Sequence, residues 1–553
     1  MHMPTVRDIP FRSIPHQSKL FLSYLDLSPI ALRFYQHAPT IESLERAARS
    51  QLAGLQLPRK EIASILRRQN EGYGGDPETL HQIGELEKPD CVAVLTGQQV
   101  GLFTGPIYTV YKALTAIQVA EELKRRGFRA VPVFWMDTED HDLPEVTRRT
   151  VLDSPSSLQI IDYREVLFKG TEMSPRSVGS LPFPEDIRQA VSNYLSHLPD
   201  SVWKSEIQSR LESTYKPGST FAVSFAQLMS RILHGCGLIF YDPQDRESKR
   251  LTSRVFQKAL RNADAIHAAL VQRNKELAET GFHTQVSVPD NSTVLFLFAD
   301  GDRRVLERHD SGFGLKNSDR TFGLEELLNY AEQSPEKFSP NVLLRPLIQD
   351  HLFPTIAYVG GSSELAYFAQ IEVLYTLFGR PMPVLWPRNS FTLLEPEIAA
   401  EMDRLGIEIE DCFQGKQLLS EKAICRSGFS KAAASLEQLQ AHLDQVLTEI
   451  RPEVEAIDPP LVPALETARR KILYNVQHLK SQVIRLEGMQ NTSVSSAIDL
   501  LLNNCFPNQN LQERELTSQH FLARHGPSLV DTIRSATEIG NFAHRVIRLD
   551  DQG

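Results

Sequence analysis

The chain has 553 residues, of which 41% are hydrophobic and 23% are charged, and its formal net charge is −10. This composition is ordinary for a globular protein, and the acidic balance disfavours general nucleic-acid binding, which needs a basic surface. The length predicts about two to four domains.

The five cysteines are scattered and none forms a CxxC pair, which disfavours a disulfide framework and a cysteine-rich zinc site. The N-terminal stretch MHMPTVRDIPFRS lacks the apolar core of a signal peptide, and no run of about 18 apolar residues suggests a membrane span. We therefore expect a cytoplasmic protein with neither a membrane partner nor a nucleic-acid partner.

Residues 17–90 are predicted to be mainly helical, because apolar residues recur at helical spacing. The character changes at CVAVLTG (91–97), a short β-type run. A glycine-rich loop follows, then an amphipathic helix over 107–127 and a second apolar strand, AVPVFWM (130–136). This order is a βαβ unit, which predicts two parallel, buried strands.

The second strand runs directly into DTEDHD, which supplies Asp137, Glu139, Asp140, His141 and Asp142. Ligands of open parallel sheets bind beyond the carboxyl ends of the strands, so we expect this loop to face the glycine-rich loop across one crevice. The set could bind a metal or a substrate ammonium, or hold the imidazole as a base. A solvated acidic loop is the alternative, and we assign no metal ligands.

The glycine-rich loop TGQQVGLFTGP matches neither the dinucleotide fingerprint nor the P-loop. Its glycines precede a helix, where backbone N–H groups suit a phosphate or a carboxylate. A tight turn is the alternative. The residues assigned here to substrate or nucleotide binding are Gly97, Gln98, Gln99, Gly101, Thr104, Gly105, Tyr108 and Lys112. Tyr108 and Lys112 share a helix face, although Lys112 alone is typical of a surface lysine.

Residues 147–235 have the polar, turn-rich character of a connecting insertion, and residues 280–310 predict an antiparallel hairpin as a second insertion. TIAYVGG is a strand that feeds a helix, and PVLWPR (383–388) is the last apolar strand. The binding residues assigned around these strands are Arg345, Gln349, Gly360, Gly361, Glu364 and Arg388. A diglycine before a helix suits an anion and Arg388 could clamp a charge, with a structural role as the alternative for each.

After Glu395 the sequence becomes helical, and apolar residues step by three or four at Leu436, Leu439, Leu443, Val446 and Ile450. The pattern resumes after IDPPLVP, which predicts two long helices in an antiparallel hairpin. A homodimer would cover the seam, and packing on its own core is the alternative. The predicted organisation is a core over 1–394, a coiled-coil dimerisation arm over 395–505 and a C-terminal segment over 506–553 that returns to the core.

Four segments occur in a fixed order: TGQQVGLFTGPIYTVYKALTAIQVAEEL, VPVFWMDTEDHDLPEV, SPNVLLRPLIQDHLFPTIAYVGGSSELAYFAQ and FPNQNLQER. Together they resemble the BshC family, the cysteine-adding enzymes of bacillithiol biosynthesis, over nearly the whole chain. One departure is visible, because Ser362 and Ser363 stand where the family commonly has Pro-Gly.

The resemblance implies an α/β fold, with a Rossmann-like parallel-sheet core, connecting insertions and an α-helical antiparallel coiled-coil arm that forms a homodimer. It also implies a nucleotide pocket near the junction of core and arm. The implied activity is that of a cysteine ligase, an enzyme that forms a C–N bond between cysteine and the amine of glucosaminyl malate in the last step of bacillithiol biosynthesis. ATP or ADP would serve carboxyl activation, with Mg²⁺ as an option, and Arg345 or Arg388 would hold the malate carboxylates.

In that reaction Asp137, Glu139 or Asp140 would hold an ammonium or magnesium. His141 would accept the proton of the attacking amine, and Asp142 would orient the imidazole. Two other functions stay open on this fold, since a fold does not fix a function. One is a nucleotidyl or nucleotide-sugar transferase, and the other is a non-enzymatic dimeric binding or scaffold protein.

Overall fold

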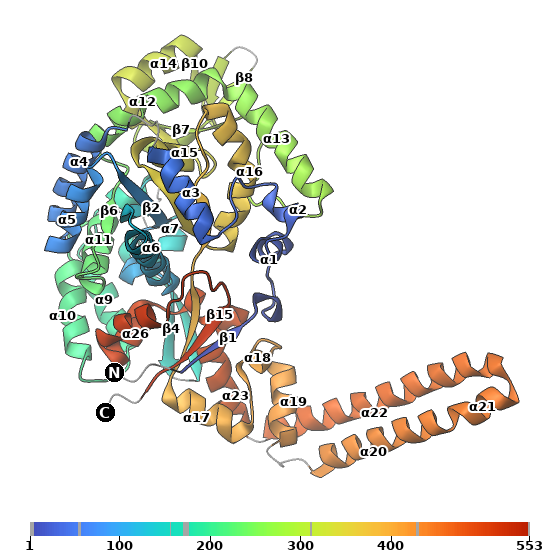
Figure 1. Cartoon of the computed structure of the whole chain (residues 1–553). Helices are drawn as coiled ribbons and strands as arrows, with labels where there is room; N and C mark the ends of the chain where they lie inside the picture. The colour runs from blue at the N-terminus through green and yellow to red at the C-terminus, as the bar shows by residue number, and fades with distance from the viewer. Residues whose placement is uncertain are drawn as a thin grey trace.

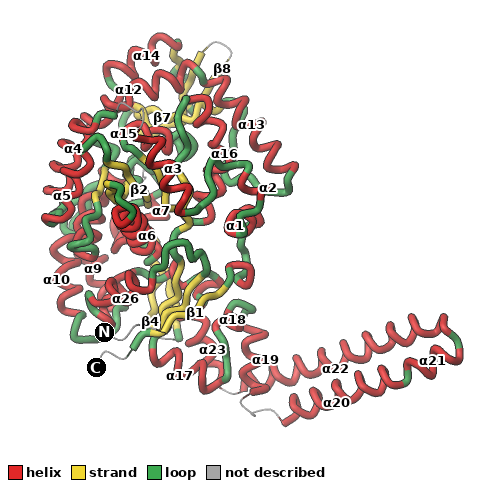
Figure 2. Tube along the Cα trace, in the orientation of Figure 1, coloured by secondary structure: helices red, strands yellow, loops and turns green. Residues whose placement is uncertain are grey.

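The computed structural model describes residues 5–52, 57–154, 156–169, 176–309, 312–426, 431–490 and 492–550. It consists of a body that contains sheets and helices and of a long helical arm that leaves one end of the body (Figure 1). Figure 2 shows all the strands in the body, and an arm of helices joined by short loops. Within these ranges, no helix is both long enough and apolar enough to cross a membrane.

A five-stranded parallel sheet forms the centre of the body, in the order β13-β12-β2-β3-β6. Its strands are β2 (Cys91–Gln98), β3 (Arg129–Met136), β6 (Ile239–Tyr241), β12 (Thr355–Gly360) and β13 (Val384–Pro387). Almost every residue of these strands is buried, which is why they are continuous apolar runs in the sequence. The predicted βαβ unit is confirmed, with α6 (Tyr108–Arg125) between the neighbours β2 and β3.

The strand order reverses at β2. Strands β3 and β6 follow on one side of β2, and β12 and β13 lie on the other side. At such a reversal the connections from adjacent strands leave toward opposite faces of the sheet, so a crevice opens between their carboxyl ends. The loops after β2 and β12 border this crevice.

The predicted N-terminal helices cover the sheet and close its edge. They are α1 (Lys19–Leu25), α2 (Pro29–Leu32), α3 (Ile41–Leu52), α4 (Arg59–Gly72) and α5 (Pro77–Leu86). The side chain of Asn70 donates to the Phe240 carbonyl (2.8 Å) and accepts from the Phe240 N–H (2.9 Å). Asn70 thus supplies the hydrogen bonds that a further strand would give to the edge strand β6.

The segment between β3 and β6 forms a mainly helical insertion. It contains α7 (Leu143–Thr147), the hairpin β4 (Arg148–Ser154) and β5 (Ser157–Asp162), then α8 (Arg164–Leu167), α9 (Ile187–Ser196), α10 (Lys204–Thr214) and α11 (Phe221–Ile232). Its apolar side chains share one core cluster with α6 and the glycine-rich loop. The insertion therefore packs directly behind the loop that follows β2.

The segment between β6 and β12 carries a second sheet, antiparallel, in the order β10-β9-β8-β7-β11. Its elements are α12 (Arg246–Arg261), α13 (Ala263–Glu279), β7 (Ser292–Ala299), β8 (Asp302–His309), β9 (Gly312–Leu315), β10 (Thr321–Phe322), α14 (Leu324–Gln333), β11 (Phe338–Pro340) and α15 (Arg345–Leu352). The hairpin expected within 280–310 is the pair β7–β8, and residue 310 lies outside the described ranges. Strands β9 to β11 continue the sheet beyond it and are too short to give a periodic signal.

A third sheet and a group of helices form the base of the arm. The sheet has the order β1-β15-β14, with β1 (Thr5–Ile9), β15 (His544–Arg548) and β14 (Ser390–Leu394). The helices are α17 (Pro396–Leu405), α18 (Ile409–Cys412), α19 (Lys416–Arg426) and α23 (Thr492–Cys505), which share a core cluster of their own. The predicted arm range of 395–505 thus takes in this base as well as the arm.

The arm itself is the antiparallel helical hairpin that the sequence predicts. It consists of α20 (Lys431–Glu449), α21 (Arg451–Ile457) and α22 (Val462–Gln490), with the proline-rich turn between α21 and α22. In Figure 1 α20 and α22 run side by side away from the body. Few arm side chains are buried within the chain.

The C-terminal segment folds back onto the junction of core and base. It contains α24 (Gln512–Glu515), α25 (Ser518–His525) and α26 (Ser528–Ala536). Gln512 pairs through its amide with the backbone N–H (2.8 Å) and carbonyl (3.0 Å) of Leu393. Glu513 is fully buried and accepts from the Arg388 guanidinium (2.5 Å) and the Phe391 N–H (3.0 Å).

Replacement of Glu513 by alanine tests how firmly this segment is held. The variant leaves the Arg388 charge buried without its carboxylate, so we expect the free energy of unfolding to fall by about 3–5 kcal/mol, measured by urea denaturation. The matched control is Glu397→Ala, which removes an exposed carboxylate from Arg524 and should cost less than about 1 kcal/mol. Equal losses of unfolding free energy in the two variants would contradict the conclusion that the buried Glu513–Arg388 pair holds this segment in place.

Candidate active site

A cavity of about 580 Å³ lies beyond the carboxyl ends of β2, β3 and β12, at the reversal of strand order. Its wall is strongly charged. The charged or titratable lining residues are Tyr108, Lys112, Asp137, Glu139, Asp140, His141, Glu145, Arg303, Arg345, Tyr358, Glu364, Arg388 and Arg514. A concave site that gathers so many polar groups at this edge of a parallel sheet is the expected place for ligand binding.

Most residues that the sequence assigned to the site line this cavity. They are Gly97, Gln98, Gln99, Tyr108, Lys112, Asp137, Glu139, Asp140, His141, Arg345, Gln349, Gly361, Glu364 and Arg388. The remaining assigned residues, Gly101, Thr104, Gly105, Asp142 and Gly360, lie outside its lining. The glycine-rich loop and the acidic loop do face one cavity, through the first residues of each loop.

A buried ion pair between Lys112 and Glu364 joins α6 to α16 (Ser362–Phe378). The Lys112 ammonium lies 2.6 Å from Glu364 Oε2, and it also donates to the Gly97 carbonyl and to Gln98 Oε1, each at 2.9 Å. Burial lowers the pKa of Lys112, and Glu364 counteracts that effect. The interpretation of Lys112 as a surface lysine is therefore wrong, because its ammonium ties the end of β2 to the helix after β12.

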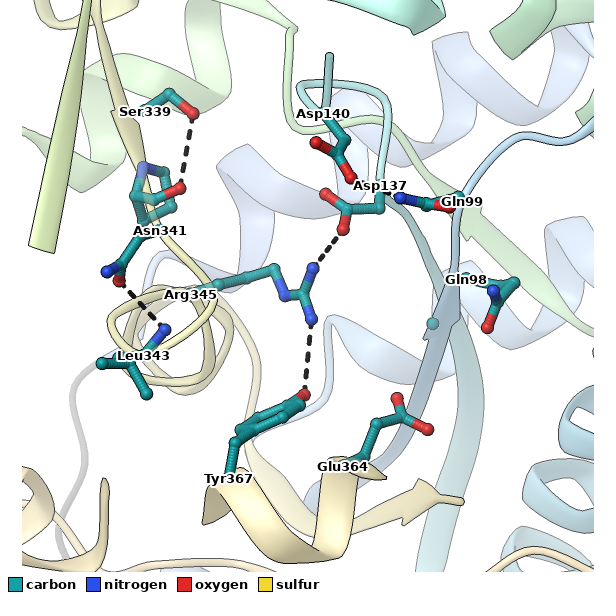
Figure 3. A network of polar contacts seen from close by, with 12 residues as sticks. Gln98, Gln99, Asp137, Asp140, Ser339, Asn341, Leu343, Arg345, Glu364 and Tyr367 are labelled. Carbon is teal, nitrogen blue, oxygen red and sulfur yellow. Dashed lines mark hydrogen bonds and ion pairs between the residues drawn. The ribbon is translucent and has the colours of Figure 1, made fainter. Parts of the chain in front are cut away.

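Arg345 forms the second ion pair, with Asp137 (Figure 3). Its guanidinium also donates to the Tyr367 hydroxyl at 3.3 Å. Arg345 is the first residue of α15, so the segment NVLLRP places this cation at the start of a helix that points toward the cavity.

Two further ion pairs anchor the wall from behind. The buried Lys249 ammonium of α12 contacts the Glu139 carboxylate and donates to the Phe338 carbonyl at 2.8 Å. Arg388 is bound by Glu513 of the C-terminal segment. Each pair joins a cavity residue to an element that is distant in sequence, so the site forms only when the insertions and the C-terminal segment have docked.

Arg303 of β8 organises the tip of the acidic loop. Its Nη1 lies 3.2 Å from His141 Nδ1 and 3.8 Å from Asp140 Oδ1. Its Nε donates to Ser339 Oγ at 3.1 Å, and its guanidinium stacks 3.8 Å above the Phe296 ring. Burial and the Arg303 charge together lower the pKa of His141.

The Asp142 carboxylate caps a helix, whereas the sequence predicted that it would orient the His141 imidazole. This carboxylate accepts from the Glu145 N–H at 3.1 Å and caps the N-terminus of α7. The proposed role of Asp142 in orienting the imidazole is therefore not supported, because the polar groups nearest to His141 Nδ1 are Arg303 (3.2 Å) and Asp140 (3.6 Å).

The glycine-rich loop does not form an open cradle for a phosphate, which corrects the expectation for Gly101 and Gly105. The Gly101 N–H donates to the Gln99 carbonyl (3.0 Å), and the Gly105 N–H donates to the Leu102 carbonyl (2.9 Å). A third N–H of the loop, at Phe103, donates to the Tyr215 hydroxyl at 2.7 Å. These three amides are bound within the protein, so Gly101 and Gly105 do not offer their N–H groups to a phosphate.

The loop is instead a tightly packed turn around a buried arginine. Phe103, Thr104 and Gly105 have φ values of 54°, 77° and 69°, and Thr104 is completely buried. A Cβ atom on Gly101 would lie 2.2 Å from the Arg149 guanidinium. Glycine is required at Gly101 because Arg149 occupies that space. Gly101 and Gly105 line a smaller cavity, of about 240 Å³, beside the main one.

The sequence assignment missed Glu145, Arg303 and Arg514. Arg303 stands after the expected hairpin turn, while Glu145 and Arg514 lie within DTEDHDLPEV and FPNQNLQER, two segments that the resemblance had singled out. In the described part of the chain, every other Lys, Arg, Asp or Glu that lines the main cavity has an ion-pair partner. Glu145 and Arg514 have none, so they are the groups with charge available to a ligand.

Glu145 lies near other carboxylates, whereas Arg514 lies near another guanidinium group. Desolvation and the neighbouring Asp140 raise the pKa of Glu145. Burial and the positive charge of Arg388 lower the pKa of Arg514, whose Nη2 also donates to Ser362 Oγ at 3.3 Å. A bound anion would relieve the repulsion between the two guanidinium groups.

The acidic loop does not have the form of a metal site. Among the described residues, no group of three or more His, Cys, Asp and Glu side chains is arranged to hold a metal ion. Asp137 and Glu139 are bound to cations of the protein, and Asp140 accepts from Gln99. The Asp137, Glu139 and Asp140 carboxylates of this loop are thus engaged by groups of the protein and do not form a set of free metal ligands.

Two family models match successive parts of the chain. Residues 5–389 match "Bacillithiol biosynthesis BshC, N-terminal Rossmann-like domain", and residues 391–549 match "Bacillithiol biosynthesis BshC, C-terminal coiled-coil domain".

Curated relatives match over nearly their full length. Proteins named "Putative cysteine ligase BshC" are similar at 34% identity in Salinibacter ruber (96% of each chain), 36% in Koribacter versatilis (98% and 99%) and 34% in Solibacter usitatus (99% and 100%). A solved structure from Campylobacter jejuni, described as a "putative arginyl t-RNA synthetase", matches 88% of this chain and 100% of its own, at 10% identity and a TM-score of 0.24. That score is too low to support an argument.

Replacement of Arg514 by glutamine tests the electrostatic layout of the cavity. Removal of the unpaired guanidinium should weaken the binding of a small dicarboxylate such as succinate by about tenfold or more, because a hydrogen bond to a charged group contributes about 1.5–3 kcal/mol. The measurement is isothermal titration calorimetry. Arg188→Gln, at an exposed arginine of α9, is the control and should bind as the wild type does. An unchanged affinity of Arg514→Gln for succinate would contradict the assignment of Arg514 as the group that binds an anion.

Proposed function

The chain belongs to the BshC family of bacillithiol biosynthesis, and on that premise we propose that it joins the carboxyl group of cysteine to the amine of glucosaminyl malate. The observation that supports this most is the charge layout of the cavity. Arg514 offers an unpaired cation for an anionic group, and Glu145 offers an unpaired carboxylate for an amine. The cavity volume of about 580 Å³ is in the usual range for a small-molecule site.

The malate carboxylates bind at Arg514 in this proposal, with Arg388 close by. Arg345 and Arg388, the residues expected to hold malate, each already neutralise a carboxylate of the protein. They can add hydrogen bonds to a ligand, but Arg514 supplies the uncompensated charge. Guanidinium groups suit this task because they bind carboxylates through two parallel hydrogen bonds.

A nucleotide is the proposed activating cosubstrate, because a carboxylate does not react with an amine until its oxygen becomes a leaving group. A nucleoside triphosphate would supply that activation as an acyl phosphate or an acyl adenylate. The N-terminus of the long helix α16 suits phosphate, and Ser362 and Ser363 there border both the main cavity and a cavity of about 290 Å³. Arg514 borders both cavities as well, and magnesium would enter with the phosphates.

A homodimer through the arm is the proposed assembly. The arm keeps a set of large apolar side chains exposed, among them Leu439, Val446, Ile450, Ile472, Leu479 and Leu486. Exposed apolar groups at coiled-coil spacing favour burial against another helix. A second copy of the chain presents the same surface, so a symmetric pair can bury both.

The activity can be tested directly by product analysis. Purified protein with cysteine, glucosaminyl malate, ATP and magnesium should form bacillithiol, detected by mass spectrometry, together with AMP or ADP. AMP would identify adenylation, and ADP would identify phosphorylation of the carboxyl group. Transfer of a nucleotidyl group to the product would contradict the ligase and favour the transferase alternative.

The assembly can be tested by placing charges on the arm. The double variant Leu439→Glu, Val446→Glu should sediment with half the mass of the wild type in analytical ultracentrifugation, because two buried charges per copy would oppose association. The control is Val202→Glu, at an apolar residue of the body that is 85% exposed, which should leave the mass unchanged. A wild-type mass of one chain would contradict the proposed dimer.

A further inference from the structure

We propose that Glu145 is the base that takes the proton of the attacking amine, and that His141 acts as a hydrogen-bond donor through Nε2. This inference rests on the proposed function, acyl transfer from an activated cysteine carboxyl to an amine. It reverses the role that the sequence suggested for His141.

The contact with Arg303 points to one tautomer of His141. A guanidinium has five N–H donors and no acceptor, so the 3.2 Å contact from Arg303 Nη1 requires a lone pair on His141 Nδ1. The neutral ring then carries its proton on Nε2. A proton taken up at Nδ1 would break this hydrogen bond and place a second positive charge next to the guanidinium.

Arg303 is held too firmly to release the ring. It is buried, it donates to Ser339 Oγ (3.1 Å) and to the Pro340 carbonyl (2.9 Å), and it stacks on Phe296. The charged groups that face His141 are Arg303 from β8 and Asp140 and Asp142 from its own loop. Desolvation and the Arg303 charge outweigh the two carboxylates, of which Asp140 Oδ1 lies 3.6 Å from His141 Nδ1, so the pKa of His141 is lowered, which agrees with a ring that remains neutral.

A neutral imidazole with a proton on Nε2 suits a developing oxyanion. The side chain of His141 is 39% exposed and lines the main cavity. When the amine attacks, negative charge develops on the carbonyl oxygen of the cysteinyl group. A fixed N–H donor at that oxygen stabilises the transition state without a change of protonation.

Glu145 is left as the base because the other carboxylates of the cavity are occupied. Asp137, Glu139, Asp140 and Glu364 are paired with Arg345, Lys249, Arg303 and Lys112. Glu145 has no ion-pair partner among the described residues, and it lines both the main cavity and the smaller one. The groups that face it are Gln99, Asp137, Asp140 and Asp142, and with desolvation their net effect raises its pKa, which strengthens it as a base.

The proposed step is balanced in atoms and charge. The neutral amine of the sugar attacks the carbonyl carbon of the activated cysteine, and a C–N bond forms. The bond from that carbon to the activating phosphate oxygen breaks, and the phosphate group leaves with the electron pair. The proton on the nitrogen passes to the Glu145 carboxylate and then to solvent, which reaches Glu145 because its side chain is exposed.

The test uses the full-length protein, with product formation measured by mass spectrometry. Glu145→Gln should lower kcat by about a hundredfold or more, the usual contribution of a general base, while succinate binding stays at the wild-type level and shows that the cavity is intact. Glu145→Ala should regain activity when formate is added, because a small carboxylate can fill the space. The matched control Glu165→Gln changes an exposed carboxylate of α8 and should keep wild-type activity.

A second measurement determines the tautomer and the pKa of the His141 imidazole without relying on enzymatic activity. In ¹⁵N NMR spectra His141 should show the Nε2–H tautomer and a pKa below that of a free histidine. A kcat of Glu145→Gln within threefold of the wild type would overturn the base assignment, and an Nδ1–H tautomer would overturn the donor assignment. A wild type that forms no product with any nucleotide would instead contradict the proposed function, so the two failures are distinguishable.

Discussion

Charge compensation among buried ionised side chains around one cavity is the constraint on which the rest of this structure depends. Ionised groups cannot be buried without partners, since the cost is several kcal/mol for each ion. Lys112 with Glu364, Arg345 with Asp137, Lys249 with Glu139 and Arg388 with Glu513 meet this requirement. Buried ion pairs of this kind contribute little net stability, so their value here lies in the geometry that they impose.

Each pair connects segments that are far apart in the chain. Lys249 reaches the acidic loop from the insertion after β6, and Glu513 reaches Arg388 from the C-terminal segment. Arg303 does the same from the antiparallel sheet, where it fixes the His141 ring. The insertions and the C-terminal segment thus have one feature in common, since each places a charged side chain at one edge of the parallel sheet. Among the described Lys, Arg, Asp and Glu residues that line the cavity, only Glu145 and Arg514 lack an ion-pair partner, and these two residues indicate where ligand charge can be accommodated.

The sequence predicted the elements of the fold better than the details of the site. Buried parallel strands are continuous apolar runs, and the position of DTEDHD after such a strand placed Asp137 to His141 at the cavity, because the edge of a parallel sheet follows from strand direction alone. The burial of Lys112 could not be predicted from the sequence, because it depends on an ion pair with Glu364, which is 252 residues away. Gly101 and Gly105 suggested an anion cradle, but the space beside Gly101 is filled by Arg149 of the insertion. Ion pairs between distant segments are set by tertiary packing and leave no local pattern.

The central claim is that the unpaired groups of the cavity bind and deprotonate the amine substrate. A crystal structure of the protein with glucosaminyl malate tests it most directly. The account predicts malate carboxylate oxygens within hydrogen-bond distance of Arg514, the sugar nitrogen within hydrogen-bond distance of the Glu145 carboxylate, and Arg303 still bound to His141 Nδ1. A sugar nitrogen that contacts the His141 ring in place of Glu145, with the malate group away from Arg514, would contradict it.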